Sequence, residues 1–388
     1  MKSICFNNAI LYSEAGKIKE PVISIKNNQI VSIKTKSEVA SIDEEVRFNE
    51  SEPVVIVPGF IDIHIHGAAG ADVMDGEAGA LQTMRHALPA EGTTSFLATT
   101  ITQQPEAKLQ ALKVVKEVIL QQDKRGAEIL GVHLEGPFIS KKRAGAQPAE
   151  FIQQADIALF QAFQEASGHY IKLVTMAPEE DPSGKLTSLL CDQQIIASIG
   201  HSDATYDEMV EAIAKGMNHV THLFNGMKGV HHRDLGVAGA ALLHDELNTE
   251  LIVDGIHVSP PVVKLAYKSK GPDKLILITD AMRAKGLAEG ESNLGGQKVS
   301  VKHDRATLED GTLAGSVLKM NDAIKNMMIF TGCSLEEAVQ MATLNPARQL
   351  RIDDRKGSLA AGKDADFTVL SPDMTVLQTY VMGEKVFG

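Results

Sequence analysis

Hydrophobic and polar positions follow two patterns along this chain of 388 residues. In the N-terminal segment, residues 1–53, apolar and polar residues alternate within short runs, which is typical of half-buried strands. The runs are Ile4–Leu11, Pro21–Ile25 and Gln29–Lys34, with Asn27-Asn28 as a turn between the last two. We therefore expect this segment to contribute strands to a small β domain.

From Val54 onward, runs rich in β-branched residues alternate with amphipathic helical stretches. Near-continuous apolar strands separated by helices indicate a parallel sheet that is buried on both faces. Eight repeats favour a (β/α)8 TIM-like barrel over residues 54–355, whereas a doubly wound open sheet would usually have fewer strands. The eight runs are Val54–His66, Thr93–Thr100, Glu128–Gly136, Ile171–Pro178, Ile195–Asp203, His219–Met227, Glu250–Val258 and Lys274–Met282.

The rest of the chain completes this plan. Arg283–Gly315 is rich in glycine and polar residues, which favours an insertion with a hairpin. The C-terminal segment, residues 356–388, returns to strand patterns, so both chain ends should build one small β domain beside the barrel. Expected helices are Glu106–Gln121, Ala155–Ala166, Asp207–Lys215, Pro260–Tyr267, Val317–Phe330 and Ser334–Thr343, the last broken by Asn345-Pro346; expected C-terminal strands are Asp366–Leu370, Thr375–Tyr380 and Glu384–Phe387.

Composition limits the classes of function. Hydrophobic residues make up 44% and charged residues 23%, as in a soluble globular protein with an ample core. With 38 Lys+Arg against 50 Asp+Glu, the net charge of −12 argues against nucleic acid as a partner. An anionic substrate would require positive charge to be gathered locally.

Cysteine usage and the N-terminus predict a cytoplasmic protein. Cys5, Cys191 and Cys333 are odd in number and far apart, so neither a disulfide framework nor a thiolate zinc site is expected. Asn7 and Asn8 interrupt any apolar leader, so no signal peptide is expected. No apolar run reaches the ~18 residues of a membrane-spanning helix.

Imidazoles and carboxylates stand at the ends of the predicted barrel strands. Two of them form His-Ile-His, in which alternate residues point to the same face of a strand. Taken singly, each could be a hydrogen-bonded strand end, but six such residues on one rim favour a metal site. Imidazole with carboxylate suits zinc or iron rather than magnesium. The set is His64, His66, Glu135, His201, His222 and Asp280.

Longer phrases around these residues carry a family resemblance. They are PGFIDIHIHG (58–67), GVHLEGPFIS (131–140), GHSDAT (200–205), THLFNGM (221–227), VDGIHV (253–258), ITDAM (278–282), DGTLAGS (310–316) and TLNPARQL (343–350). Over nearly its whole length the chain resembles the N-acetylglucosamine-6-phosphate deacetylase family of the amidohydrolase superfamily. LEGP, HLFN and DGTLAGS together are specific to that family. The resemblance implies a barrel with a small β-sandwich, a homodimer and a cytoplasmic role in amino-sugar catabolism.

The resemblance also implies a reaction, the hydrolysis of N-acetylglucosamine 6-phosphate to glucosamine 6-phosphate and acetate. A bound divalent metal can activate water and polarise the acetyl carbonyl. One carboxylate can accept the water proton and then protonate the leaving amine, and Asp280 matches the family residue with that task. Glu135, His201 and His222 would hold the metal.

Family members divide at the first strand. Some have Gln-x-Asn in place of His-x-His, hold one metal, and place a His twelve residues after the metal-binding Glu. Here His64 and His66 are present and position 147 is Gln, so we expect two ions per chain, zinc or iron, with Glu135 bridging them. The second ion would polarise the carbonyl, and Gln147 becomes a candidate substrate-binding residue.

Further candidates for substrate binding follow strands six and seven. Asn225 and Gly226 offer an amide and a backbone N–H to a phosphate, although the pair is equally consistent with a simple turn. The family resemblance implies phosphate contacts by His257 and, across a dimer interface, by Arg233. The residues alone favour a loop arginine paired with Asp234, and they fit a strand-end histidine at least as well as a phosphate contact.

Other histidines and other functions stay open. His133 is a candidate for supporting the metal ligands, and we treat His86, His169, His219, His244 and His303 as structural or surface residues. Alternatives to the main hypothesis are a deacetylase for another phosphorylated N-acetyl hexosamine, a cyclic amidase, and a non-catalytic amidohydrolase-like scaffold. The phosphate-binding candidates disfavour the cyclic amidase, and the intact rim disfavours the scaffold.

Overall fold

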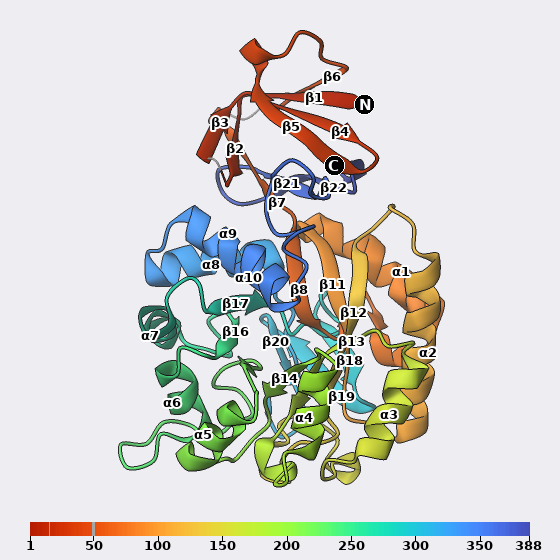
Figure 1. Ribbon diagram of the computed structural model, residues 1–388, viewed down its shortest axis with the longest axis vertical. Coiled ribbons are helices and arrows are strands. Elements are labelled where there is room, and N and C mark those ends of the chain that lie inside the picture. Colours follow the sequence, from red (N-terminus) through yellow and green to blue (C-terminus); the bar gives the residue numbers. More distant parts are fainter. Residues whose placement is uncertain (15, 49–50) are drawn as a thin grey trace.

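An eight-stranded parallel sheet forms the centre of the molecule in a computed structural model that describes residues 1–14, 16–48 and 51–388 (Figure 1). Its strands follow chain order around the sheet. Just after the last strand, the Asp280 N–H donates to the carbonyl of His64 in the first strand at 2.8 Å and brings the sheet edges together. The strands are β8 (Phe60–Ile65), β11 (Thr93–Thr100), β12 (Glu128–Glu135), β13 (Ile171–Met176), β14 (Ile196–Ile199), β15 (His219–Val220), β16 (Asn248–Ile252) and β17 (Leu275–Ile278).

Helices surround this sheet, which confirms the predicted (β/α)8 barrel (Figure 1). Their inner faces are apolar, and several begin at residues suited to capping. Thr205 and Ser334 cap α5 and α9, each paired with a Glu three residues later. The helices are α1 (Ala78–Ala87), α2 (Pro105–Gln121), α3 (Ile157–Ala166), α4 (Lys185–Asp192), α5 (Tyr206–Ala214), α6 (Gly236–Leu243), α7 (Pro260–Lys270), α8 (Met320–Thr331), α9 (Leu335–Ala342) and α10 (Leu344–Gln349).

Both chain ends build the small β domain, as predicted, and it stands at one end of the barrel (Figure 1). Two sheets of four and six strands enclose a separate core in which the ring of Phe6 packs edge-on against Phe367 and Tyr380. The strands are β1 (Lys2–Asn7), β2 (Ala9–Ser13), β3 (Gly16–Lys19), β4 (Pro21–Lys26), β5 (Gln29–Thr35), β6 (Glu44–Arg47), β7 (Val54–Pro58), β21 (Phe367–Leu370), β22 (Val376–Val381) and β23 (Glu384–Phe387).

Two predicted strands are each divided into two in the structure. Val54–His66 is two strands, because Gly59 separates β7, which pairs with β2 and β21, from barrel strand β8. Ile4–Leu11 is also two strands, divided at Asn8, whose φ is 53°. The helix predicted over Ser334–Thr343 ends before Asn345-Pro346 as expected, but these two residues lie in the first turn of a further helix, α10, where proline is tolerated. The division of the chain into residues 1–53, 54–355 and 356–388 stays a prediction.

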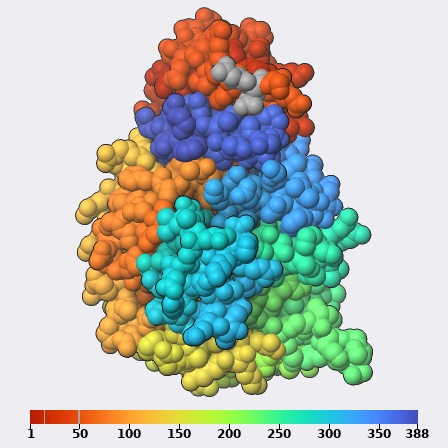
Figure 2. Space-filling view, turned by 180° about the vertical axis from the view of Figure 1, so that it is seen from behind, coloured from red at the N-terminus to blue at the C-terminus, as the bar shows by residue number. Residues whose placement is uncertain are grey.

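The insertion after β17 forms a three-stranded antiparallel sheet, one strand more than the expected hairpin. Its strands are β18 (Gly290–Leu294), β19 (Gln297–Lys302) and β20 (Arg305–Thr307). It packs through its own small core, and Figure 2 shows the cyan-to-blue segment lying against the barrel. No helix in the described part of the chain is long and apolar enough to cross a membrane.

A buried charge cluster joins the small domain to the barrel. The Lys356 ammonium contacts Glu128 at the start of β12 at 2.8 Å, Asp364 at 3.1 Å, and Asp366. The three carboxylates lie close enough to hold a cation. The ammonium of Lys356 lies among them, and its side chain is 2% exposed. Removing one member of such a cluster leaves buried charge without compensation.

Lys356→Met should therefore destabilise the fold by about 3–5 kcal/mol, because Asp366 loses its buried cation, while Arg355 still pairs with Glu128 and Asp364. Urea denaturation followed by circular dichroism measures this loss. Lys298→Met is the matched control, since Lys298 pairs with Glu291 on the surface, where both side chains are more than 70% exposed. Equal small losses in the two variants would contradict the assignment.

Candidate active site

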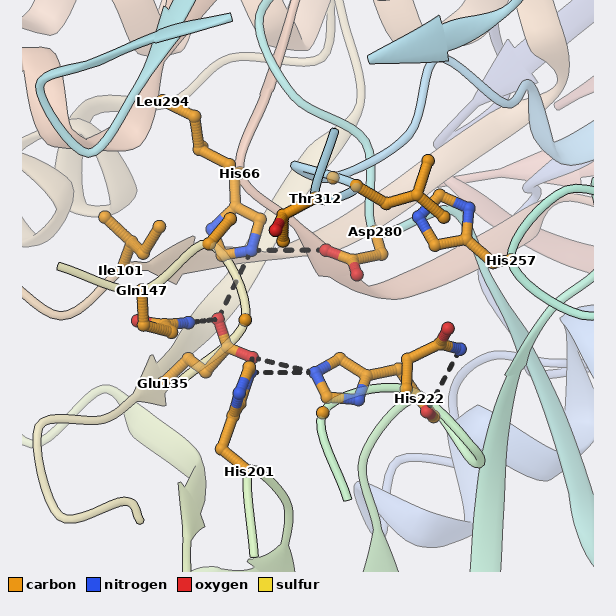
Figure 3. Close-up of a pocket in the computed structure, with 16 residues that line it drawn as sticks. His66, Ile101, Glu135, Gln147, His201, His222, His257, Asp280, Leu294 and Thr312 are labelled. Atoms are coloured by element: carbon orange, nitrogen blue, oxygen red, sulfur yellow. Dashed lines mark hydrogen bonds and ion pairs between the residues drawn. The ribbon is translucent and has the colours of Figure 1, made fainter. Parts of the chain in front are cut away.

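A pocket of about 210 Å³ opens at the carboxyl ends of the barrel strands (Figure 3). Strand-end residues form its floor, and Leu294, Thr312 and Leu313 from the insertion close it from above. Five of the six predicted metal ligands line this pocket, while His64 lies fully buried behind them. The predicted residues that line it are His66, Glu135, Gln147, His201, His222, Asn225, Gly226, His257 and Asp280.

Glu135, His201 and His222 form the first group of potential ligands. Oε1 of Glu135 lies 3.1 Å from Nε2 of His201 and 3.2 Å from Nε2 of His222, and the two ring nitrogens are 3.1 Å apart. Nδ1 of His201 donates to the Arg143 carbonyl at 2.8 Å, so in the neutral ring Nε2 offers its lone pair to the site. Two imidazoles and one carboxylate converging in this way fit a zinc-like ion.

His64, His66 and Asp280 form the second group. Oδ1 of Asp280 lies 3.4 Å from Nε2 of His64 and 3.3 Å from Nε2 of His66. The other oxygen of Glu135, Oε2, lies 3.4 Å from His66 Nε2. Glu135 thus turns one oxygen to each group, the geometry expected of a carboxylate that bridges two ions (Figure 3).

The electrostatics of the second group favour positive charge. Burial opposes the charged form of His64, but the carboxylates of Asp280, Glu250 and Glu135 outweigh it and raise its pKa to about 10. Burial likewise opposes ionisation of Glu135, yet His64, His201 and His222 hold its pKa well below the usual range. His64 Nε2 has no hydrogen-bond partner among the described residues. These donors fit a divalent cation, which would supply the positive charge that the carboxylates favour.

Three of the predicted ligands lie just beyond their strands, in left-handed backbone. The φ angles of His201, His222 and Asp280 are 47°, 30° and 47°. β14, β15 and β17 are therefore shorter than the predicted runs. Such conformations cost about 1–3 kcal/mol each and collect at functional sites, where the surroundings enforce them. Here they turn the side chains into the barrel mouth.

Motif segments hold these turns in place. The Ser316 N–H in DGTLAGS donates to the Asp280 carbonyl at 2.8 Å, and the Ser140 N–H in LEGPFIS donates to the His201 carbonyl at 2.8 Å. Asp62 accepts from the N–H of His64 at 3.2 Å and from the Thr279 hydroxyl, and so ties β8 to the end of β17. The motif segments that indicated the site in the sequence thus also hold its ligand-bearing turns through hydrogen bonds.

Of four buried residues beneath the ligands, only His133 was a candidate from the sequence, whereas Lys108, Glu250 and His219 were given no role at the site. Lys108 of α2 donates to the carbonyls of Glu135 and Gly136 at 2.9 and 2.8 Å. His133 packs edge-on against the His64 ring, with centroids 4.4 Å apart, and contacts Thr175, so it does support the ligands. Glu250 contacts Nδ1 of His64 and Nε2 of His219. The sequence feature that could have identified them is a charged or polar residue within an apolar run.

The substrate candidates divide into two groups. Gln147 lies in the pocket, where its amide donates to Glu135 Oε2 at 2.6 Å and accepts from the Thr102 N–H at 2.8 Å. Nδ1 of His257 contacts Asp254 at 2.6 Å, in a turn that follows β16. Asn225 and Gly226 line the same pocket as His257.

Arg233 lies outside the pocket, on an exposed loop. Its guanidinium contacts His232 at 2.7 Å and has no carboxylate partner in the described chain. Asp234 pairs instead with Lys228, at 2.7 Å, so the pairing of Arg233 with Asp234 does not occur. The guanidinium is available to a group outside this chain.

A barrel with imidazoles and carboxylates at one mouth defines a class of hydrolases, and comparison with known proteins places the chain within it. The chain belongs to the amidohydrolase family, whose model matches residues 55–386. It is 46% identical over 388 residues to the N-acetylglucosamine-6-phosphate deacetylase of Bacillus subtilis, covering 100% of this chain and 98% of that protein.

Solved structures agree with this placement. The N-acetylglucosamine-6-phosphate deacetylase of Thermotoga maritima superposes with a TM-score of 0.87 at 36% identity, over 98% of this chain and 99% of that one. A mutant of the Mycobacterium smegmatis deacetylase, in complex with N-acetyl-D-glucosamine-6-phosphate, gives 0.92 at 28% identity, over 100% and 99% of the two chains.

Gly226→Ala should disrupt the first group of ligands. A Cβ at this position would lie 2.8 Å from Nδ1 of His201 and displace the ring. We expect zinc affinity to fall by about 10-fold or more, measured by competition with a chelator. Gly332→Ala is the matched control, because it has the same left-handed backbone with nothing within 4 Å of the new Cβ. Unchanged zinc affinity in Gly226→Ala would contradict the geometry.

Proposed function

We propose that this chain hydrolyses the acetamide of N-acetyl-D-glucosamine 6-phosphate, releasing acetate and D-glucosamine 6-phosphate. The observation that carries the proposal is the Glu135 carboxylate shared between two groups of ligands, with Asn225, Gly226 and His257 in the same pocket. The relatives with that activity match the chain over its full length. We infer two divalent ions per chain, zinc or iron, one in each group.

Asp280 is the proposed proton carrier. Bound metal supplies an activated water and a polarised acetyl carbonyl. Asp280 accepts the proton of the attacking water and delivers it to the leaving amine, since one carboxylate can serve as base and then as acid. Burial opposes ionisation of the Asp280 carboxyl, but the neighbouring rings of His64 and His66 outweigh it and hold the pKa of Asp280 below its usual range. Asp280 therefore begins the reaction ionised.

The wall across the pocket from Gln147 is the proposed phosphate site (Figure 3). The Asn225 amide and Gly226 line the same pocket as His257, whose ring is held by Asp254. Gln147 lies at the other end of the pocket, next to Glu135, where the acetamide would be placed. This arrangement orients the sugar with its amide toward the ligands and its phosphate toward the loop after β15.

We further propose a homodimer in which Arg233 reaches the partner's phosphate site. The loop that carries Arg233 is adjacent to α6, and the same side of the chain exposes three apolar side chains, Val210, Val230 and Leu243. An unpaired guanidinium suits phosphate, because its planar fork can donate two parallel hydrogen bonds. It would also supply local positive charge in a protein of net charge −12.

Asp280→Asn should abolish acetate release while the fold and the ion in the first group are retained. The amide has nearly the same shape but cannot shuttle a proton. Acetate is measured enzymatically with N-acetylglucosamine 6-phosphate and, separately, with its galacto epimer, which distinguishes the two phosphorylated substrates. Near-normal turnover in the variant would refute the role of Asp280; no acetate from either substrate with metal-loaded wild type would refute the function.

Arg233→Ala should raise KM for the 6-phosphate by about 10–150-fold, the loss of a charge-assisted contact of 1.5–3 kcal/mol. Activity on unphosphorylated N-acetylglucosamine should change little. In mixed dimers of Arg233→Ala and Asp280→Asn subunits, one composite site retains both groups and should be active. Equal losses on both substrates, or inactive mixed dimers, would contradict a contact in trans.

A further inference from the structure

Glu250 is a buried carboxylate at the centre of β16 that does not line the pocket. It is 0% exposed. Oε2 accepts from Nδ1 of His64 at 2.9 Å and from the backbone N–H of His222 at 3.1 Å, while Oε1 accepts from Nε2 of His219 at 3.1 Å. It therefore contacts one proposed ligand from each of the two groups. Any effect of Glu250 on the reaction must therefore act through those residues.

The contact with His64 decides which ring nitrogen faces the site. An ionised carboxylate only accepts hydrogen bonds, so Nδ1 of His64 must carry a proton. Nε2 then faces Asp280, 3.4 Å away, and Glu135, 3.7 Å away, and a cation that displaces the Nε2 proton would meet a lone pair there. A buried lone pair facing two carboxylates is repulsive unless a cation lies between them. The contact thus prepares Nε2 as a metal ligand.

The contact with His222 fixes backbone rather than a ring. The His222 residue has a φ of 30°, and its N–H donates to Glu250, while the following N–H, of Leu223, donates to the Glu250 carbonyl at 2.9 Å. The turn that aims the His222 side chain is therefore held by the side chain and the main chain of one residue. His219 occupies the remaining oxygen and anchors the carboxylate from below.

We propose that Glu250 is a positioning residue that sets the tautomer of His64 and so governs occupancy of the ion site formed by His64, His66 and Asp280. Carboxylates that orient a ligating histidine typically change metal affinity by about 10–100-fold. The His222 turn is also held by the main-chain hydrogen bond from Leu223 to the Glu250 carbonyl. The ion site formed by Glu135, His201 and His222 therefore depends less on the Glu250 side chain. The proposal rests on the two-ion site of the proposed function.

The test is zinc titration of metal-free Glu250→Gln against wild type, by competition with a chromogenic chelator. Glutamine keeps the volume but removes the charge, so the hydrogen bond from Nδ1 of His64 is no longer charge-assisted, and His219 must change tautomer to accept from the new amide group. We expect one of the two zinc sites to lose about 10–100-fold in affinity and the other to change little. After dialysis against limiting zinc, elemental analysis should fall from about two ions per chain to about one.

Glu128→Gln is the matched control, because it removes a largely buried carboxylate from the opposite end of the barrel. It should lower stability without changing either zinc affinity.

If Glu250→Gln does not fold, Glu250→Asp keeps the charge but falls short of His64 and should show the same selective loss. Two unchanged zinc sites in the Glu250 variant, an equal loss in Glu128→Gln, or a single zinc site in wild type would overturn the proposal. Zinc binding does not depend on the substrate, so absence of deacetylation alone would refute only the proposed function.

Discussion

The carboxylate of Glu135 lies 1% exposed at the barrel mouth, where burial alone would favour its neutral form. Three histidines keep it ionised, and each of its oxygens faces a separate group of ring nitrogens. Much of the surrounding structure supports this one charged group. Lys108 holds its backbone, Gln147 holds one of its oxygens, and Glu250 orients His64 across from it. Breaking such a buried network from one side is costly.

The barrel makes this arrangement possible because its parallel strands deliver side chains from distant segments to one rim. Left-handed turns at His201, His222 and Asp280 then aim those side chains inward. The conformational cost of these turns is offset by contacts from segments that follow other strands, among them Ser140 and Ser316. The insertion β18–β20 closes the pocket from the remaining side, while the small domain binds the opposite end of the barrel through Lys356.

Much of the fold and the rim could be predicted because both follow from local patterns. The period of apolar residues predicted the barrel, and strand-end polar residues predicted which side chains meet. The break at Gly59 was missed although Pro58-Gly59 is a turn signal; a Cβ at Gly59 would lie 2.2 Å from Thr94, so only glycine fits there. Glu250 could not be assigned, because its partner His64 is 186 residues away and only the closed barrel brings them together.

The most direct test of the account is an anomalous-scattering crystal structure of the zinc-loaded protein. Two peaks per chain should flank Glu135, the first within bonding distance of His201 and His222 and the second within bonding distance of His64, His66 and Asp280. Zinc–nitrogen distances should be about 2.0–2.1 Å. A single peak, or peaks that leave Glu135 outside the coordination sphere of both ions, would contradict the claim that one shared carboxylate organises the site.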